Sequence, residues 1–192
     1  MEIVIKRKKY LVCEEIDDSS YHATYKNKDF FIKKYDPNSK EFEHFLNTHR
    51  LLMHSGVNVA KIYKIDKKSG FVVEQYLKGE TIESLIIKGP LDESIYEQVF
   101  AMNWYAKNSR MRLDFSIDKW TLINNKLYYL SYKNEVYEKK KDFTQVEVYL
   151  WFYTKNLVQY LKKKGLPVDE NRLKGEYDTT LEILKMITKY YR

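Results

Sequence analysis

The sequence predicts an α+β fold in which short antiparallel strands come first and helices follow. The first third of the 192-residue chain contains short β-prone runs separated by polar turns. Apolar residues then recur at helical spacing between residues 92 and 108. Between residues 113 and 132, two apolar runs flank Asn124-Asn125. Asn tolerates the positive φ that a tight hairpin turn requires, so this stretch predicts a β-hairpin among the helices.

Length and composition indicate one domain or two small lobes. Hydrophobic residues make up 44% of the chain, and only 6 Gly and 3 Pro are present, so we expect a substantial core and no long flexible linker. The single Cys13 excludes an internal disulfide and fits a reducing compartment. No apolar run approaches the ~20 residues that span a bilayer, and the N-terminus lacks a signal-peptide pattern. We therefore expect a cytoplasmic protein without a transmembrane segment.

The formal net charge is +7, and lysines cluster at residues 6–9, 139–141 and 162–164. Such clusters raise the affinity for nucleic acid, anionic membranes or phosphorylated ligands. They are also typical of solvated faces that bind nothing. The sequence matches no zinc-finger, helix-turn-helix or RNP spacing, and its four His residues form no metal-ligand pattern. Charge alone therefore leaves a nucleic-acid function open.

The predicted elements of the first part alternate between strands and one helix. Polar residues at 36–39 open the helix, where Asn38 or Ser39 is the expected cap, and its apolar stripe ends near Gly56. The expected strands are Tyr10–Glu15, Tyr21–Tyr25, Phe30–Lys34, Val59–Ile65 and Gly70–Tyr76.

The second part is predicted to be mainly helical. A short helix at residues 82–87 ends at Gly89-Pro90, and a charged connector at residues 134–142 follows the hairpin. The apolar run Tyr149–Tyr153 is expected to pack in the core rather than to stack on bases. The longer expected helices are Asp92–Asn108, Thr144–Lys164 and Glu176–Tyr191.

Three motifs appear in a familiar order along the chain. Phe30-Phe31-Ile32-Lys33 resembles the V-A-I-K strand of protein kinases. The stretch Phe71–Thr81 is similar to the kinase hinge, and Leu113–Tyr132 resembles the catalytic loop with its metal-binding strand. Together they resemble the small bacterial and archaeal kinase-like phosphotransferases over roughly Leu11–Tyr132.

The resemblance implies a bilobal fold. Residues 1–79 would form an N-lobe with a five-stranded antiparallel sheet and one helix. Residues 80–192 would form a reduced helical C-lobe that carries the β-hairpin. An unrelated α+β domain without a nucleotide cleft is the alternative architecture.

The resemblance also implies an ATP site. Lys33 would bind the α- and β-phosphates and pair with a Glu of the following helix, which is Glu43 or, in another register, Glu41. The carbonyl of Gln75 and the N–H of Leu77 would hydrogen-bond the adenine ring.

The same resemblance implies catalytic residues within the third motif, Leu113–Tyr132. Asp114 stands in the place of the catalytic base, and Asp118 is a spare carboxylate that could bind Mg²⁺. The two usual metal ligands, an Asn and an Asp, are replaced by Lys119 and Ser131. A lysine there puts positive charge where the divalent cation would sit.

Two further departures affect nucleotide binding. Glu74 stands at the gatekeeper position, where an apolar side chain usually walls the adenine pocket, and a buried carboxylate must be paired. The phosphate-binding loop, glycine-rich in kinases, is replaced by residues 17–20, Asp-Asp-Ser-Ser.

Three functions remain open from the sequence. The favoured prediction is a catalytically degenerate kinase-like protein, a pseudokinase, that binds a protein partner or a nucleotide. The second is an active atypical kinase that uses ATP. The third is a basic protein that binds nucleic acid or a membrane surface through its lysine clusters.

Overall fold

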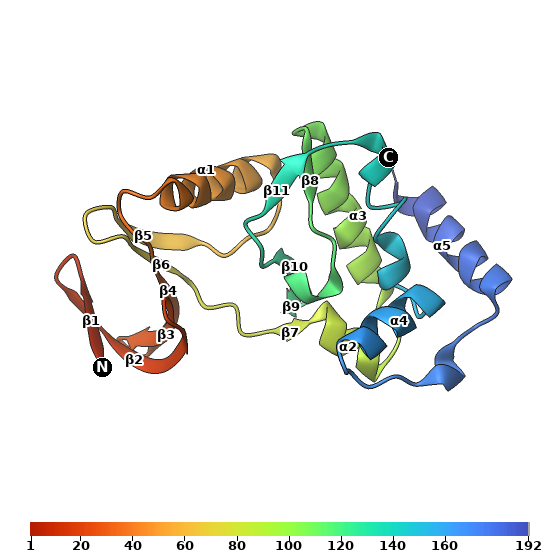
Figure 1. Ribbon diagram of the computed structural model, residues 1–192, viewed down its shortest axis with the longest axis horizontal. Helices are drawn as coiled ribbons and strands as arrows, with labels where there is room; N and C mark the ends of the chain where they lie inside the picture. Colours follow the sequence, from red (N-terminus) through yellow and green to blue (C-terminus); the bar gives the residue numbers. More distant parts are fainter. Residues whose placement is uncertain (192) are drawn as a thin grey trace. The chain divides into compact units, whose positions relative to one another are not determined.

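The computed structural model describes residues 1–191, and the chain divides into two compact units (Figure 1). Unit 1 contains Met1–Leu51 and Val59–Lys78. Unit 2 contains Leu52–Asn58 and the chain from Gly79 onward. Helices and antiparallel strands are both present, so the predicted α+β class is confirmed.

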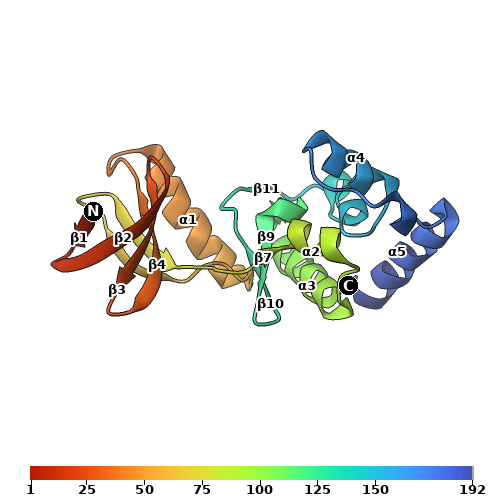
Figure 2. The same ribbon diagram turned by 90° about the horizontal axis from the view of Figure 1, so that it is seen from below.

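Unit 1 is built on a curled antiparallel sheet of six strands (Figure 2). The strand order is β1-β2-β3-β4-β6-β5. The expectation of five strands is wrong, because residues 2–5 form an additional strand that pairs with β2. Its elements are β1 (Glu2–Ile5), β2 (Lys8–Asp17), β3 (Ser20–Tyr25), β4 (Lys28–Lys34), β5 (Ile62–Asp66), β6 (Phe71–Gln75) and α1 (Lys40–Ser55), whose last residues are assigned to unit 2.

The core of unit 1 follows from the alternation of side chains along its strands. Ile3 and Ile5 of β1 are buried, whereas Val4 between them is 57% exposed. Complete burial of an aliphatic side chain contributes about 1.5–3 kcal/mol, which explains how a strand of four residues is held in place. The other buried members of this core are Tyr10, Tyr21, Ala23, Ile32 and Val73.

Helix α1 begins where the sequence predicts. The Ser39 hydroxyl accepts a hydrogen bond of 3.1 Å from the backbone N–H of Phe42, which makes Ser39 the cap. Phe42 and Phe45 are buried, and their rings stack on Tyr35 at centroid distances of 5.2 and 5.0 Å. These rings fix the apolar stripe of the helix against the chain that leaves β4.

Unit 2 contains the remaining helices and two small sheets. One sheet has the order β10-β9-β7, and β11 pairs with β8 in the other. Helix α3 packs against α5, β8 and β10 (Figure 1). None of the helices in residues 1–191 has the length and apolar character needed to cross a membrane. The elements are β7 (Glu80–Thr81), α2 (Ile82–Lys88), α3 (Glu93–Asn108), β8 (Met111–Leu113), η1 (Ile117–Lys119), β9 (Trp120–Ile123), β10 (Lys126–Tyr129), β11 (Asn134–Val136), η2 (Lys139–Lys141), η3 (Val148–Leu150), α4 (Lys155–Lys163), η4 (Glu170–Arg172) and α5 (Glu176–Tyr190).

The predicted hairpin is confirmed. Ile123 pairs with Lys126, and the two turn residues Asn124 and Asn125 have φ of 49° and 60°. Positive φ at both residues of a two-residue loop matches the right-handed twist of the flanking strands. The turn sequence therefore determines this hairpin locally.

The predicted long helix Thr144–Lys164 is wrong in its first half. Turns and the short η3 occupy this stretch, and α4 starts only at Lys155. The Asp142 carboxylate accepts the N–H of Thr144 at 3.0 Å, and the Thr154 hydroxyl accepts the N–H of Leu157 at 3.1 Å. These side chains accept hydrogen bonds from backbone N–H groups in place of helical carbonyls. They therefore interrupt the predicted helix between Asp142 and Thr154.

An aromatic cluster forms the centre of unit 2. Phe115 lies against Trp120 and Phe143 at centroid distances of 5.2 and 4.6 Å. Trp151 packs edge-on against Trp120 and Phe143, both at 6.0 Å. All of these rings are buried. Of the run Tyr149–Tyr153, Trp151 and Phe152 belong to the core as expected, whereas Tyr149 is exposed.

Candidate functional site

Asp114 lies in a loop that the aromatic cluster fixes through its backbone. The indole N–H of Trp120 donates to the Asp114 carbonyl at 3.0 Å, and the indole of Trp151 donates to the Phe115 carbonyl at 2.8 Å. The Asp114 N–H donates to the Tyr129 hydroxyl at 3.1 Å, and this hydroxyl donates to the Lys133 carbonyl at 2.8 Å. The loop is therefore held by side chains that are themselves immobilised by packing.

The Asp114 side chain faces a cavity of about 210 Å³ within unit 2. Its Oδ1 accepts the Ser116 N–H at 2.9 Å, as in a local turn. This hydrogen bond involves only one of the two carboxylate oxygens. The cavity is also lined by Arg112, Leu113, Lys133 and Glu135.

Arg112 joins this loop to two carboxylates. Its Nε donates to the Lys141 carbonyl at 2.7 Å, and its Nη1 donates to Glu135 at 2.9 Å. Its Nη2 forms an ion pair with Glu147, whose side chain is only 10% exposed. One guanidinium thus serves three acceptors.

The pKa of Glu147 is raised above its ordinary value. Burial raises its pKa to about 7, the Arg112 charge opposes the shift, and the nearby Asp114 carboxylate adds to it. Its Oε2 is buried without a hydrogen-bond partner in the described structure. A carboxylic acid that titrates near neutral pH therefore lies close to the candidate base.

Asp118, the candidate metal ligand, is instead surrounded by lysines. Its Oδ2 lies 2.7 Å from the Lys119 ammonium and 3.3 Å from the Lys164 ammonium. Burial would raise the pKa of Asp118, but its bonds to these lysines outweigh this effect and hold the pKa below its usual range. Lys164 also donates to Glu83 at 2.7 Å, and the Tyr160 hydroxyl donates to the same oxygen at 2.9 Å.

The residues around Asp118 do not form a magnesium site. A divalent cation would have to displace two ammonium groups from its carboxylate. Ser131, at the place of the second metal ligand, accepts the Lys133 N–H at 3.2 Å. Within residues 1–191, no group of three or more His, Cys, Asp or Glu is placed to hold a metal ion.

In unit 1, Lys33 lies 3.5 Å from the carboxylate of Glu74. Phe31 is opposite Glu74 and Lys33 is opposite Val72, so Lys33 and Glu74 are diagonal neighbours on one face of the sheet. The Glu74 side chain is 2% exposed. Glu43, the predicted partner of Lys33, is exposed on α1.

The turn that replaces the phosphate-binding loop is stabilised by hydrogen bonds to the carboxylate of Asp17. Asp17 Oδ1 accepts the Ser19 N–H at 2.8 Å and the Ser19 hydroxyl at 3.0 Å. These bonds, and others to Ser20, lower the pKa of Asp17 against the opposing effect of burial. The N–H of Ser19 is therefore already bonded to an anion of the chain.

The predicted adenine-binding groups lie at the end of β6 and in the segment that follows it. Gln75 ends β6, and its N–H donates to the Lys61 carbonyl at 2.8 Å. Leu77 lies in the irregular segment between β6 and β7 and is partly buried. No contact distinguishes these two residues as ligands of a ring.

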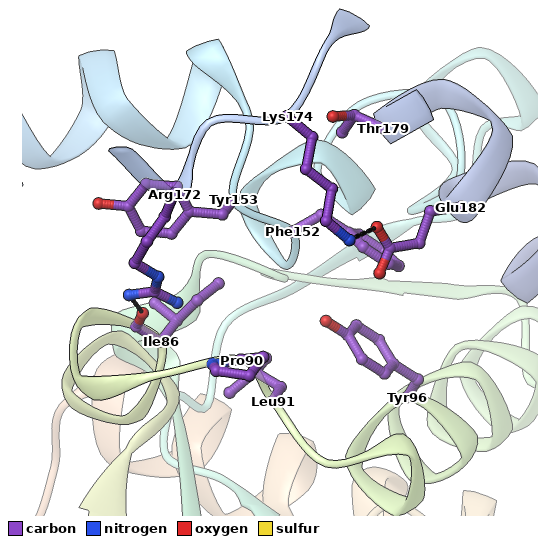
Figure 3. A pocket seen from close by; sticks show the side chains of 10 residues that line it. All are labelled: Ile86, Pro90, Leu91, Tyr96, Phe152, Tyr153, Arg172, Lys174, Thr179 and Glu182. Atoms are coloured by element: carbon purple, nitrogen blue, oxygen red, sulfur yellow. Dashed lines mark hydrogen bonds and ion pairs between the residues drawn. The ribbon is translucent and has the colours of Figure 1, made fainter. Parts of the chain in front are cut away.

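A larger cavity of about 310 Å³ lies among the helices of unit 2 (Figure 3). The guanidinium of Arg172 donates to the carbonyls of Ile86 and Ile87 at 2.8 and 2.9 Å and lies 4.0 Å from the Tyr153 ring. Lys174 pairs with Glu182 across the cavity at 2.7 Å. The charged groups around it are thus bonded to the protein, and none of them was predicted as a site residue.

Sequence reasoning missed Glu147 and Lys164. The only local signal for Glu147 is a carboxylate inside the apolar stretch from Phe143 to Tyr153. A carboxylate there must be paired, so it marks a special environment. Lys164 has no comparable signal, because it belongs to a run of lysines whose members look alike.

No family model matches this sequence, and no curated protein matches it.

Proposed function

We propose that this chain is a kinase-like protein whose nucleotide-binding groups are neutralised by its own side chains, and that it acts by binding a protein partner rather than by transferring phosphate. The order of elements supports this proposal. Three strands, one helix and two strands precede the Asp114 loop and its hairpin. This is the order that the resemblance implies, with β1 added at the start.

The pair of Lys33 and Glu74 carries the proposal. In a kinase, the ammonium of this lysine binds nucleotide phosphates. Here a carboxylate that is almost fully buried lies 3.5 Å from it. Moving the ammonium to a phosphate would weaken its hold on a buried anion, which costs several kcal/mol in comparable pairs. The pair therefore competes with a nucleotide.

Two more groups are neutralised in the same way. Asp118 is bound by Lys119 and Lys164 instead of a metal ion. The Ser19 N–H is bound by Asp17 instead of a phosphate. Because phosphoryl transfer depends on positioning and charge neutralisation by metal ions, the loss of these contacts removes most of the expected catalysis.

A thermal-melt titration with ATP, with and without Mg²⁺, tests the proposal. An enzyme at 100 times its Kd for ATP would gain about 2.7 kcal/mol of stability. We expect no Mg²⁺-dependent shift in the melting temperature of this chain. A shift of several degrees, together with phosphate release that is lost in Asp114→Asn, would refute the proposal.

Substitution of Glu74 tests whether its pair with Lys33 is the reason for weak ATP binding. Glu74→Met supplies the apolar gatekeeper of an ordinary kinase and removes the ion pair with Lys33, so we expect it to increase the affinity for ATP. Glu43→Gln is the matched control, because it removes an exposed carboxylate of α1 at the predicted partner position. Equal ATP affinities in the two variants would show that Glu74 does not block the site.

An active atypical kinase is the second candidate, and one observation favours it. Asp114 lines a cavity, and the pKa of Glu147 nearby is raised to about 7. Groups that titrate near the working pH are suited to proton transfer. ATP hydrolysis that falls in both Asp114→Asn and Glu147→Gln, but not in Glu135→Gln, would favour this function.

A further inference from the structure

Two turns of unit 1 carry basic residues in a conformation that seldom suits them. Lys6 and Arg7 join β1 to β2 with φ of 47° and 68°. Lys26 and Asn27 join β3 to β4 with φ of 51° and 59°. Two-residue turns of this kind favour Asn and Gly, because a larger side chain is strained at positive φ. Local stability therefore does not explain the choice of Lys6, Arg7 and Lys26.

The two turns lie together at one end of the sheet. The ammonium groups of Lys8 and Lys26 are 5.3 and 5.6 Å from the centroid of the same ring, Tyr25. Lys64 of β5 donates to the carbonyls of Ile5 and Lys6 at 3.0 and 3.3 Å. The curled sheet thus gathers cations from three segments that are distant in sequence. We call this group the basic rim; its members are Lys6, Arg7, Lys8, Lys26 and Lys64.

One carboxylate, Asp66, interacts electrostatically with Lys64 and Lys6, and it offsets only part of the charge of the basic rim. Within residues 1–191, none of its members forms an ion pair with a carboxylate, and the nearby Lys9 pairs with Glu2 at 3.3 Å. Partial burial and the charges of Lys8 and Lys6 lower the pKa of Lys64, and Asp66 opposes this shift. The cations therefore repel one another, and a bound polyanion would relieve this repulsion.

A chain of ring contacts links Tyr25, beside the basic rim, to Tyr63 through the buried core residue Tyr10. Tyr25 lies 5.3 Å from Tyr10, Tyr10 lies 5.6 Å from Phe30, and Phe30 lies 5.6 Å from Tyr63. The last ring, Tyr63, is 51% exposed, and the Lys61 ammonium is 5.7 Å from its centroid. An exposed ring beside a row of cations provides a surface on which a base can stack.

We propose that the basic rim and Tyr63 form a binding site for single-stranded nucleic acid. The cations bind successive phosphates, and Tyr63 stacks on a base. An anionic membrane is less suitable, because the four turn residues Lys6, Arg7, Lys26 and Asn27 include no apolar side chain that could enter the acyl layer. This site lies wholly in unit 1 and does not depend on the proposed kinase-like function.

The first test uses the double variant Lys6→Asn/Arg7→Gly. Binding of a labelled oligouridylate of ~12 nucleotides is followed by fluorescence anisotropy at about 50 to 200 mM salt. We expect the affinity to fall by about tenfold or more and the slope of log K against log salt to decrease by ~1.4, since each lost phosphate contact removes ~0.7. The melting temperature should rise by about 2–6 °C, because Asn-Gly suits this turn. Lower affinity in a more stable protein cannot result from unfolding.

A matched control removes the same charge elsewhere. Lys139→Asn/Lys140→Asn changes two exposed lysines of another cluster, in unit 2. We expect it to bind RNA nearly as tightly as the unchanged protein. An equal loss in both double variants would refute the site, because it would show that only the net charge matters.

A second variant tests the base contact. Tyr63→Ala should lower the affinity by about tenfold and leave the salt slope unchanged, since stacking releases no counterions. Vesicles with about 30% phosphatidylserine test the membrane as the anion. Binding to these vesicles without binding to RNA would overturn the proposal, as would RNA binding that Lys6→Asn/Arg7→Gly and Tyr63→Ala leave unchanged.

Discussion

Glu74 of unit 1 and Glu147 of unit 2 are both carboxylates beneath the surface that contact a cation, yet their surroundings differ. Glu74 lies on β6, between β4 and β5, and the Lys33 ammonium is 3.5 Å away. Glu147 shares the guanidinium of Arg112 with Glu135 and with the Lys141 carbonyl. Its second oxygen has no hydrogen-bond partner among the described residues, and its pKa is raised to about 7.

The difference shows that burial alone does not decide how a carboxylate is stabilised. A cation shared among three acceptors compensates each of them less, so burial raises the pKa of Glu147 in spite of Arg112. The Glu147 carboxyl can therefore gain or lose a proton near neutral pH. Glu74 is important for a different reason, because its contact engages the lysine that the resemblance assigns to phosphate binding.

The largest expected effect comes from removing the cation of unit 1. Lys33→Met takes the ammonium away from a carboxylate that is 2% exposed, and we expect a loss of about 3–5 kcal/mol in the free energy of unfolding, measured with urea. Lys34→Met is the control, because Lys34 is the exposed neighbour on the same strand. Equal losses in both variants would show that the pair with Glu74 contributes nothing. The double variant Lys33→Met/Glu74→Leu should recover most of the stability, because both charges are then absent.

The second prediction concerns pH and unit 2. The folded protein keeps a proton on Glu147 up to about pH 7, whereas the unfolded chain loses it near the ordinary value. Because the folded state binds more protons in this window, its stability falls as the pH rises toward 7. Glu147→Gln removes this dependence.

Urea unfolding between about pH 5 and pH 8 measures this prediction. We expect the stability of the unchanged protein to fall by about 1–3 kcal/mol relative to Glu147→Gln across this range. A change of the opposite sign would mean that Arg112 dominates and holds the pKa of Glu147 down. Glu97→Gln, at an exposed position of α3, is the control with the same change in charge.

The smallest expected effect sharpens the same comparison. Glu135 is 64% exposed and competes with Glu147 for Arg112. Glu135→Gln should change the stability by less than about 0.5 kcal/mol, as is usual for exposed pairs. It should nevertheless move the pH transition assigned to Glu147 to lower pH, because Arg112 then serves fewer acceptors. An unmoved transition would show that Arg112 is not shared in the way described.

The hairpins show how far turn chemistry predicts the fold. Asn124-Asn125 was predicted because Asn accepts positive φ, and the structure confirms the hairpin. Lys6-Arg7 adopts the same kind of turn without this signal, so β1 and the sixth strand of the sheet were missed. Pairing with β2, burial of Ile3 and Ile5 and the contact with Lys64 hold that turn. The turn residues Lys6-Arg7 do not predict a hairpin, so β1, which tertiary contacts stabilise, is not predicted from the sequence.

The sequence motifs name candidate site residues but do not predict which side chains these residues contact. The motifs directed attention to Lys33, Asp114 and Asp118, and Glu74 was recognised as unusual at its position. The structure pairs Glu74 with Lys33 and brings Lys164 to Asp118. Glu147 falls within the predicted helix Thr144–Lys164, but in the structure it lies in a turn before η3, beside Arg112.

Features that depend on contacts between neighbouring residues can be predicted from the sequence. These include the α+β class, the Ser39 cap of α1 and the Asn124-Asn125 hairpin. A side chain that satisfies a backbone group two or three residues away leaves a readable local pattern.

The pairing of charged side chains that are distant in sequence depends on the folded structure. Arg112 and Glu147 are 35 residues apart, and Lys164 and Glu83 are 81 residues apart. Such pairs depend on where the folded chain places each backbone segment, and one lysine or glutamate in a sequence resembles any other. The charges that define the candidate site and the basic rim acquire their partners, burial and pKa values only when the chain has folded.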